Sequence, residues 1–133
     1  MEKEKAVLTS CHVIAVVGLS PDPGRPSYHV ASYLQEKGYR IIPVNPQTDN
    51  ILGETCYPDL VSIPEKIDAV DIFRRADEVP LIVEQAIKIG ARAVWMQEGV
   101  VNEAAARRAA NAGLLVIMDR CMLKEHRRTI AFE

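Results

Sequence analysis

The stretch Val13-Ile-Ala-Val-Val-Gly-Leu-Ser-Pro-Asp-Pro-Gly-Arg-Pro-Ser-Tyr28 decides the fold of this chain. Its continuous apolar run, Val13 to Val17, is typical of a parallel strand buried on both faces. The run stops at Gly18, and a loop rich in Ser, Pro and Gly leads to a helical pattern that begins near Pro26. A strand that meets a helix through such a turn presents free backbone N–H groups at the positive end of the helix dipole. The stretch therefore predicts a phosphate-binding loop.

The composition bounds the class of protein. The 133 residues fit one domain, 1–133, that is large enough to bury a core. A net charge of −2 and an aromatic content of 5% argue against a nucleic-acid partner. The apolar runs are too short to span a bilayer, and the charged start, Met1-Glu-Lys-Glu-Lys5, lacks the apolar segment of a secretory signal. We expect a cytoplasmic protein with neither nucleic acid nor membrane as a partner.

The residues that commonly bind metals or catalyse reactions form no recognisable group. Cys11, Cys56 and Cys121 are odd in number and scattered, which argues against a disulfide framework or a zinc site and favours a reducing compartment. No His, Cys and carboxylate set has metal-ligand spacing, so we predict no metal. No Ser-His-Asp or Lys-based arrangement is present either, and we assign no catalytic residue. Whether the chain is an enzyme stays open, with a non-enzymatic role favoured.

Strand and helix patterns alternate along the chain with short connections. We expect strands at 13–17, 40–45, 67–73, 91–96 and 114–118, a short strand within 54–60, and helices at 27–37, 80–89 and 102–111. The tail from Asp119 onward is polar and basic and receives no element. Right-handed crossovers turn this order into an α/β, Rossmann-like, doubly wound and mainly parallel sheet with helices on both faces.

In such a sheet the ligand lies outside the carboxyl ends of the strands, so the residues just after each strand matter most. These segments contain Arg25, Arg74, Arg75 and Arg120, a basic cluster in a weakly acidic chain. The cluster indicates an anionic small molecule rather than a polymer.

The loop departs from the dinucleotide fingerprint. Ser20 stands where the second glycine belongs, and Asn45-Pro46 follows the second strand where an acid for the ribose is expected. Simple NAD binding is therefore disfavoured, whereas NADP stays open because arginines can hold its 2′-phosphate. A phosphate-rich adenine nucleotide without a redox role fits better, with Ser20, Ser27 and Arg25 as donors.

Each of these residues also has a purely structural interpretation. Gly18 suits any tight turn between a strand and a helix, with or without a ligand. Phe73 fits the core better than a place against a base, and Arg74-Arg75 fits a solvated pair about as well as a ligand contact. Cys121 is expected to be an unreactive small residue unless the neighbouring cation activates it.

Several motifs in order resemble the small, stand-alone CoA-binding proteins, which are similar to the N-terminal CoA-binding domain of the succinyl-CoA synthetase α subunit. The motifs are the loop after the first strand, Val44-Asn45-Pro46, Val70-Asp-Ile-Phe-Arg74, Trp95-Met-Gln-Glu-Gly99 and Met118-Asp-Arg-Cys121. The resemblance covers about 11–121 and implies a Rossmann-like fold that binds coenzyme A.

The resemblance also implies where parts of CoA would lie. The loop would hold the phosphates through Gly18, Leu19, Ser20, Arg25, Pro26 and Ser27. The adenosine end would lie at Val44, Asn45 and Pro46, with Phe73 and Arg74 beside the adenine and ribose. Gln97, Glu98 and Gly99 would follow the pantetheine arm, and Asp119, Arg120 and Cys121 would close the thiol end. A mixed disulfide between Cys121 and CoA is a further hypothesis.

Three functions remain at this point. The first is a non-catalytic CoA carrier, sensor or partner module, because the second, histidine-bearing domain of the synthetase does not follow in this sequence. The alternative is an NADP-type reductase or an acyl-CoA-handling enzyme. The third is a regulatory protein whose Ala-rich helix and basic tail dock a partner. A homo-oligomer and an unknown protein partner both stay open.

Overall fold

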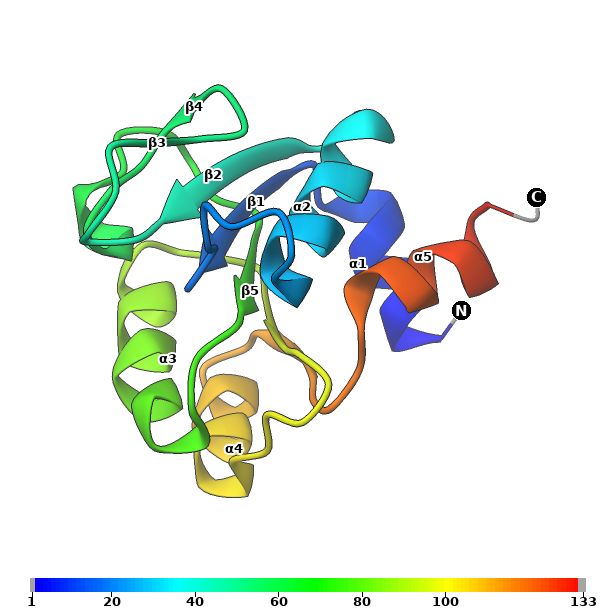
Figure 1. The fold of residues 1–133 in the computed structure, drawn as a ribbon. Helices are drawn as coiled ribbons and strands as arrows, with labels where there is room; N and C mark the ends of the chain where they lie inside the picture. Colours follow the sequence, from blue (N-terminus) through cyan, green and yellow to red (C-terminus); the bar gives the residue numbers. More distant parts are fainter. Residues whose placement is uncertain (1, 132–133) are drawn as a thin grey trace.

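The computed structural model describes residues 2–131, and its centre is a five-stranded parallel sheet (Figure 1). The strands stand in the order β2 (Arg40–Val44), β1 (Val13–Val17), β5 (Ala69–Ile72), β6 (Ala93–Met96) and β7 (Leu115–Ile117). Every neighbouring pair in this sheet is parallel. The Rossmann-like α/β fold predicted from the sequence is confirmed.

Five α-helices cover the two faces of the sheet. They are α1 (Lys3–Ser10), α2 (Pro26–Glu36), α3 (Val79–Lys88), α4 (Glu103–Asn111) and α5 (Met122–Thr129), with two 3₁₀ turns, η1 (Leu60–Ser62) and η2 (Ala76–Glu78). One core lies between the sheet and α1, α2 and α5, and the other between the sheet and α3 and α4. Alternate residues of each strand serve the two cores, because successive side chains point to opposite faces.

The chain reverses its direction across the sheet between β1 and β5. It leaves β1 for β2 at one edge, and then crosses back to β5 on the other side of β1. Residues after β1 and β5 therefore meet at the switch point, which is where open α/β sheets leave a crevice for a ligand.

The helix boundaries follow local signals that the sequence carries. Asn102 is the N-cap of α4, where its side chain accepts a hydrogen bond of 3.0 Å from the Ala105 N–H. Pro26 and Pro80 occupy first-turn positions of α2 and α3, where the missing N–H costs nothing.

A short strand forms within 54–60 as expected, but it does not belong to the main sheet. Only β4 (Glu54–Thr55) forms there, and it pairs antiparallel with β3 (Asn50–Ile51) in a separate two-stranded sheet. The chain then turns at Pro58, and the Asp59 side chain accepts from the Ser62 N–H and starts η1. Tyr57 forms a single parallel bridge with Val44 at the end of β2, and the proline and the N-cap aspartate that follow stop the extended run there.

Two helices, α1 and α5, lie outside the elements predicted from the sequence. The tail after Asp119 is not an irregular basic segment, since α5 buries Met122, Leu123, His126 and Thr129 on one side. This i, i+1, i+4, i+7 spacing is a helical period that the many charges between these residues hide. Helices α1 and α5 contact each other and share the first core.

Candidate functional site

Gly18 lies where the ends of β1 and β5 meet. Its φ of +87° is a left-handed conformation, and a Cβ there would lie 2.4 Å from the Phe73 carbonyl oxygen. The Gly18 N–H donates to the Val44 carbonyl at 3.0 Å, and the Phe73 N–H donates to Val17 at 2.8 Å. Only glycine fits this close approach of two backbones.

The loop that follows is held by its own hydrogen bonds. The Ser20 N–H donates to the Ser27 hydroxyl at 2.9 Å, and the Ser20 hydroxyl accepts from Asp22 at 3.1 Å. The Gly24 N–H donates to the Asp22 carboxylate at 2.9 Å. Most loop amides are thus occupied, so the loop itself offers few free N–H donors.

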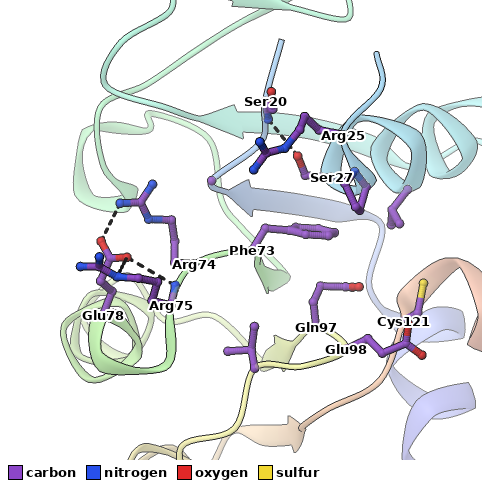
Figure 2. Close-up of a pocket in the computed structure, with 14 residues that line it drawn as sticks. Ser20, Arg25, Ser27, Phe73, Arg74, Arg75, Glu78, Gln97, Glu98 and Cys121 are labelled. Atoms are coloured by element: carbon purple, nitrogen blue, oxygen red, sulfur yellow. Dashed lines mark hydrogen bonds and ion pairs between the residues drawn. The ribbon is translucent and has the colours of Figure 1, made fainter. Parts of the chain in front are cut away.

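The free donors lie instead at the start of α2. Within residues 2–131 no acceptor meets the backbone N–H groups of Ser27 and Tyr28, which belong to the first turn. Arg25 precedes this turn as the N-cap residue, is exposed, and forms no ion pair in the described chain. Figure 2 shows its guanidinium over the opening beside Ser20 and Ser27. Together these groups form a site with positive potential and several N–H donors.

Two cavities of about 680 and 770 Å³ meet at this point. Both are lined by Gly18, Ser20, Arg25, Arg74 and Glu78, so they form one groove along the carboxyl edge of the sheet. We call the part with Gln97 and Cys121 the first cavity and the part with Asn45 the second cavity.

The groove brings together most of the residues that the sequence analysis selected. The first cavity also contains Pro26, Ser27, Phe73, Gln97, Glu98 and Cys121, and the second contains Val44, Asn45 and Pro46. Asn45 has a structural task as well, because its Nδ2 donates to the Leu19 carbonyl at 2.9 Å and thereby ties the loop after β2 to the loop after β1.

Four of the selected residues line neither cavity: Leu19, Gly99, Asp119 and Arg120. Leu19 is fully buried in the first core, where it supports the loop. Asp119, in a left-handed conformation with φ of 61°, accepts from the Gly99 N–H at 2.7 Å and joins the loops after β6 and β7. Arg120 lines a separate cavity with Lys3 and Arg107.

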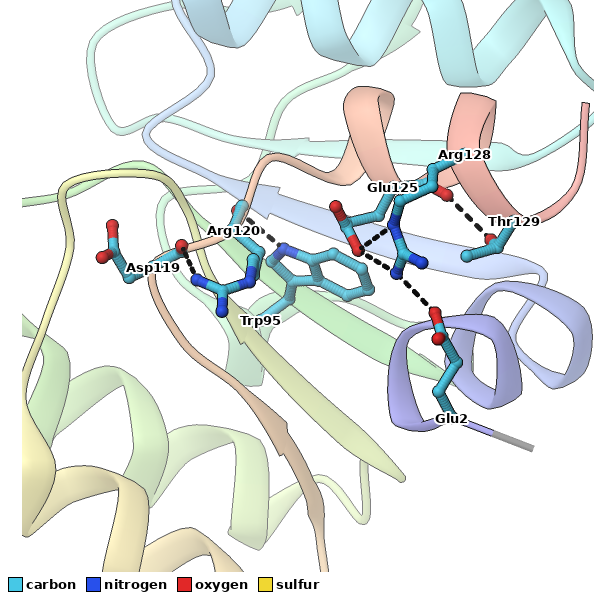
Figure 3. Close-up of polar contacts among 7 residues, drawn as sticks. All are labelled: Glu2, Trp95, Asp119, Arg120, Glu125, Arg128 and Thr129. Carbon is cyan, nitrogen blue, oxygen red and sulfur yellow. Dashed lines mark hydrogen bonds and ion pairs between the residues drawn. The ribbon is translucent and has the colours of Figure 1, made fainter.

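The position of Arg120 follows from its backbone. Its carbonyl accepts a 2.9 Å hydrogen bond from the indole Nε1 of Trp95, and its guanidinium donates to the Asp119 carbonyl at 2.8 Å (Figure 3). The chain then enters α5 with Cys121 as the N-cap, and Cys121 is the residue that reaches the first cavity.

Arg74 is not a free cation. It pairs with Glu78 at 2.6 Å, one turn along the chain, and this contact lowers the pKa of the Glu78 carboxyl. Glu78 was not selected from the sequence, although its spacing of i, i+4 from Arg74 is a signal for such a pair. The pairing leaves Arg25 as the cation best placed to bind an anion at the junction of the two cavities.

A buried acid lies beneath the first cavity. Asp71 in β5 is 0% exposed, and its Oδ1 accepts from the Gln97 Nε2 at 2.8 Å. Burial raises the pKa of Asp71 to about 7. This residue was also missed, although a single acid within the apolar run of 67–73 is a visible signal in the sequence.

The described residues contain neither a cluster of metal-binding side chains nor a helix that could span a membrane. Among residues 2–131 no three His, Cys, Asp or Glu side chains gather as metal ligands would. No helix in the same range is long and apolar enough to cross a membrane.

Comparisons with known proteins give this geometry a context. The family model described as "CoA binding domain" matches residues 12–127. An uncharacterized protein of Bacillus subtilis, YneT, is 41% identical over 122 residues, which are 92% of this chain and 90% of that protein. A hypothetical protein from Pyrococcus horikoshii superposes with a TM-score of 0.94 at 42% identity, covering 98% of this chain and 93% of that one.

Larger enzymes contain a similar domain. The ADP-forming acetate–CoA ligase II of Archaeoglobus fulgidus is 33% identical over 93 residues, which are 68% of this chain but only 14% of the ligase. A dinucleotide-forming acetyl-coenzyme A synthetase from Ca. Korarchaeum cryptofilum has a TM-score of 0.78 at 26% identity, over 89% of this chain and 28% of the synthetase. With a family model that spans most of its length, the chain belongs to the CoA-binding domain family.

Proposed function

We propose that this chain binds coenzyme A along the groove at the carboxyl edge of the sheet, as a carrier, sensor or partner module. One observation carries the proposal: Arg25 and the backbone N–H groups of Ser27 and Tyr28, which have no partner among residues 2–131, lie at the junction of two cavities. CoA has the matching order of parts, because its pyrophosphate joins an adenosine 3′-phosphate to a long pantetheine arm.

The two cavities differ in a way that favours one orientation of the ligand. The second cavity is bordered by Val44, Asn45 and Pro46 and suits the adenosine end. The first cavity runs from Arg25 past Phe73 to Gln97 and Cys121, and it suits the narrower pantetheine arm with the thiol toward Cys121. Membership of the CoA-binding domain family supports this choice of ligand over NADP.

A thermal-shift panel of CoA, acetyl-CoA, NAD, NADP and ATP tests the proposal. A ligand that binds only the native state raises its melting temperature, so CoA should give the largest shift. A large shift with NADP and none with CoA would contradict the proposal.

Arg25→Ala tests the junction itself. Losing a charged hydrogen bond to phosphate should weaken CoA binding by about 1.5–3 kcal/mol, measured by calorimetry. Arg107→Ala is the matched control, because Arg107 is an arginine in the separate cavity with Lys3 and Arg120. Equal losses in the two variants would show that Arg25 acts only through net charge, and an unchanged affinity in Arg25→Ala would remove it from the site.

A further inference from the structure

Asp71 is an acid inside the apolar centre of the protein. It lies in β5 between Val16 of β1 and Trp95 of β6, on the face covered by α1, α2 and α5. Its exposed fraction is 0%. A carboxylate in such a place is costly unless a hydrogen bond compensates for the lost water.

Only one oxygen of Asp71 has that compensation from another side chain. Oδ1 accepts from the Gln97 Nε2 at 2.8 Å. Oδ2 has no partner, and within residues 2–131 it is the one buried side-chain oxygen or nitrogen in this condition. An unsatisfied buried polar atom in a native protein calls for a functional explanation.

The partner of Asp71 faces the groove. Gln97 follows β6 and lines the first cavity together with Phe73 and Cys121. An ionised carboxylate only accepts hydrogen bonds, so it fixes the Gln97 amide with Nε2 toward Asp71 and the carbonyl oxygen away from it. No donor in the described chain bonds to that carbonyl oxygen. The oxygen is not buried, since the buried side-chain atoms without a partner do not include it. Figure 2 shows the Gln97 oxygen on the cavity side, in the direction of Cys121.

Protonation of Asp71 reverses this arrangement. A proton on Oδ2 leaves a buried O–H donor without an acceptor. A proton on Oδ1 can instead be donated to the Gln97 oxygen once the amide turns over, and the turned amide presents Nε2 to the cavity. The pKa of Asp71, raised by burial to about 7, puts this change near neutral pH. The Gln97 hydrogen bond and the nearby Ile72 backbone N–H act in the opposite direction, because both favour the charged carboxylate and so lower the pKa of Asp71.

No charged neighbour shares in the titration of Asp71. The two strand neighbours are Val16 and Trp95, which do not titrate in this range. The other titratable groups packed on this core are Cys11, Tyr28, Tyr33, Tyr39, Cys56, Cys121 and His126. None of them contributes to the pKa of Asp71.

We propose that Asp71 is a positioning residue that sets whether Gln97 offers a hydrogen-bond acceptor or a donor to the bound ligand. Ionised Asp71 holds an acceptor toward the cavity, suited to an amide N–H of the pantetheine arm. Protonated Asp71 turns the amide and offers a donor in its place. This inference rests on the proposed function, because it takes CoA as the ligand.

The amide of Gln97 gives a direct readout that needs no ligand. Its side-chain ¹⁵N and ¹H resonances, assigned by their absence in Gln97→Met, should shift with pH between about 5.5 and 8.5 in the wild-type protein. Asp71→Asn keeps the shape and removes the charge, so the same resonances should stay constant. A Gln97 amide that does not titrate in the wild-type protein overturns the inference, whatever the variant does.

The affinity for CoA supplies the second readout. The ratio of the wild-type Kd to the Asp71→Asn Kd, measured at each pH, cancels the ionisation of CoA itself. This ratio should rise about three- to tenfold from pH 8 to pH 6. The reason is that the hydrogen bond between the Gln97 oxygen and a pantetheine N–H is lost, and the Gln97 Nε2 donor then faces that N–H donor. CoA binding with a constant ratio overturns this inference and leaves the proposed function intact. Absence of CoA binding at every pH overturns the proposed function and this inference with it.

Discussion

Replacing Asp71 with asparagine should make the free energy of unfolding less dependent on pH. The unfolded carboxyl releases its proton near pH 3.9, whereas the buried carboxyl holds its proton to about pH 7. The contribution of Asp71 to stability is therefore fully present below pH 3.9 and is lost as the pH rises through 7.

The size of the effect follows from these two values. Between pH 5 and pH 8 the wild-type protein should lose about 2.5 kcal/mol more unfolding free energy than Asp71→Asn, because one pKa unit corresponds to about 1.4 kcal/mol. Urea unfolding at a series of pH values, followed by the fluorescence of the buried single tryptophan, Trp95, measures this difference.

An exposed carboxylate serves as the control. Asp77 has a side chain that is 74% exposed, so Asp77→Asn should follow the wild-type pH profile. If the wild-type and Asp71→Asn profiles stay parallel within about 0.5 kcal/mol from pH 5 to pH 8, Asp71 is not a buried titrating acid and the reasoning about Gln97 fails with it.

Three further predictions concern the loop, α5 and Cys121. Gly18→Ala should lower the free energy of unfolding by about 2 kcal/mol or more, measured by urea unfolding. The control Gly113→Ala has a similar φ of +93° but open space around it, so it should cost only about 1 kcal/mol. Equal costs in the two variants would refute the close backbone contact at Gly18. Burial lowers the pKa of His126, so stability that is present above pH 6.5 should be lost as the pH falls, and His126→Phe should show less of this loss in the same unfolding experiment. With CoA and diamide as the oxidant, mass spectrometry should find a CoA adduct that dithiothreitol removes; its persistence in Cys121→Ser would place it on another cysteine.

The parts of the fold that local patterns determine could be predicted from the sequence. The apolar run before Gly18 and the proline and glycine signals around α2 and α3 placed the strands and helices to within one or two residues. The N-cap at Asn102 could be predicted for the same reason, because a side chain that hydrogen-bonds to its own helix needs no distant partner.

The rest depends on contacts between distant segments. Residues 54–60 contribute no strand to the main sheet, because Pro58 and Asp59 stop the extended run after one bridge between Tyr57 and Val44, and the strand propensity of the segment alone does not show this. Helix α5 is stable because Met122 and His126 pack against the first core. The charged residues between them obscure this apolar side of the helix in the sequence.

The residues of the candidate site also divide into those that a local motif predicts and those whose positions depend on contacts between distant segments. Arg25 and Gly18 could be selected because the loop motif is continuous in sequence. The direction of Arg120 could not, since Trp95, 25 residues away, binds its carbonyl and turns the guanidinium toward the separate cavity. The Asp71–Gln97 contact joins β5 to the residue that follows β6, 26 residues along the chain, so only the register of β5 and β6 reveals it.

Chemical-shift mapping with CoA tests the central claim most directly. In a ¹⁵N-labelled protein titrated with CoA, the largest backbone shifts should fall at Gly18, Arg25, Asn45 and Gln97, and should saturate at one CoA per chain. Residues of the separate cavity, such as Arg107, should not move. Shifts that gather around Arg107, or no shifts at any CoA concentration, would contradict the assignment of the groove as a CoA site.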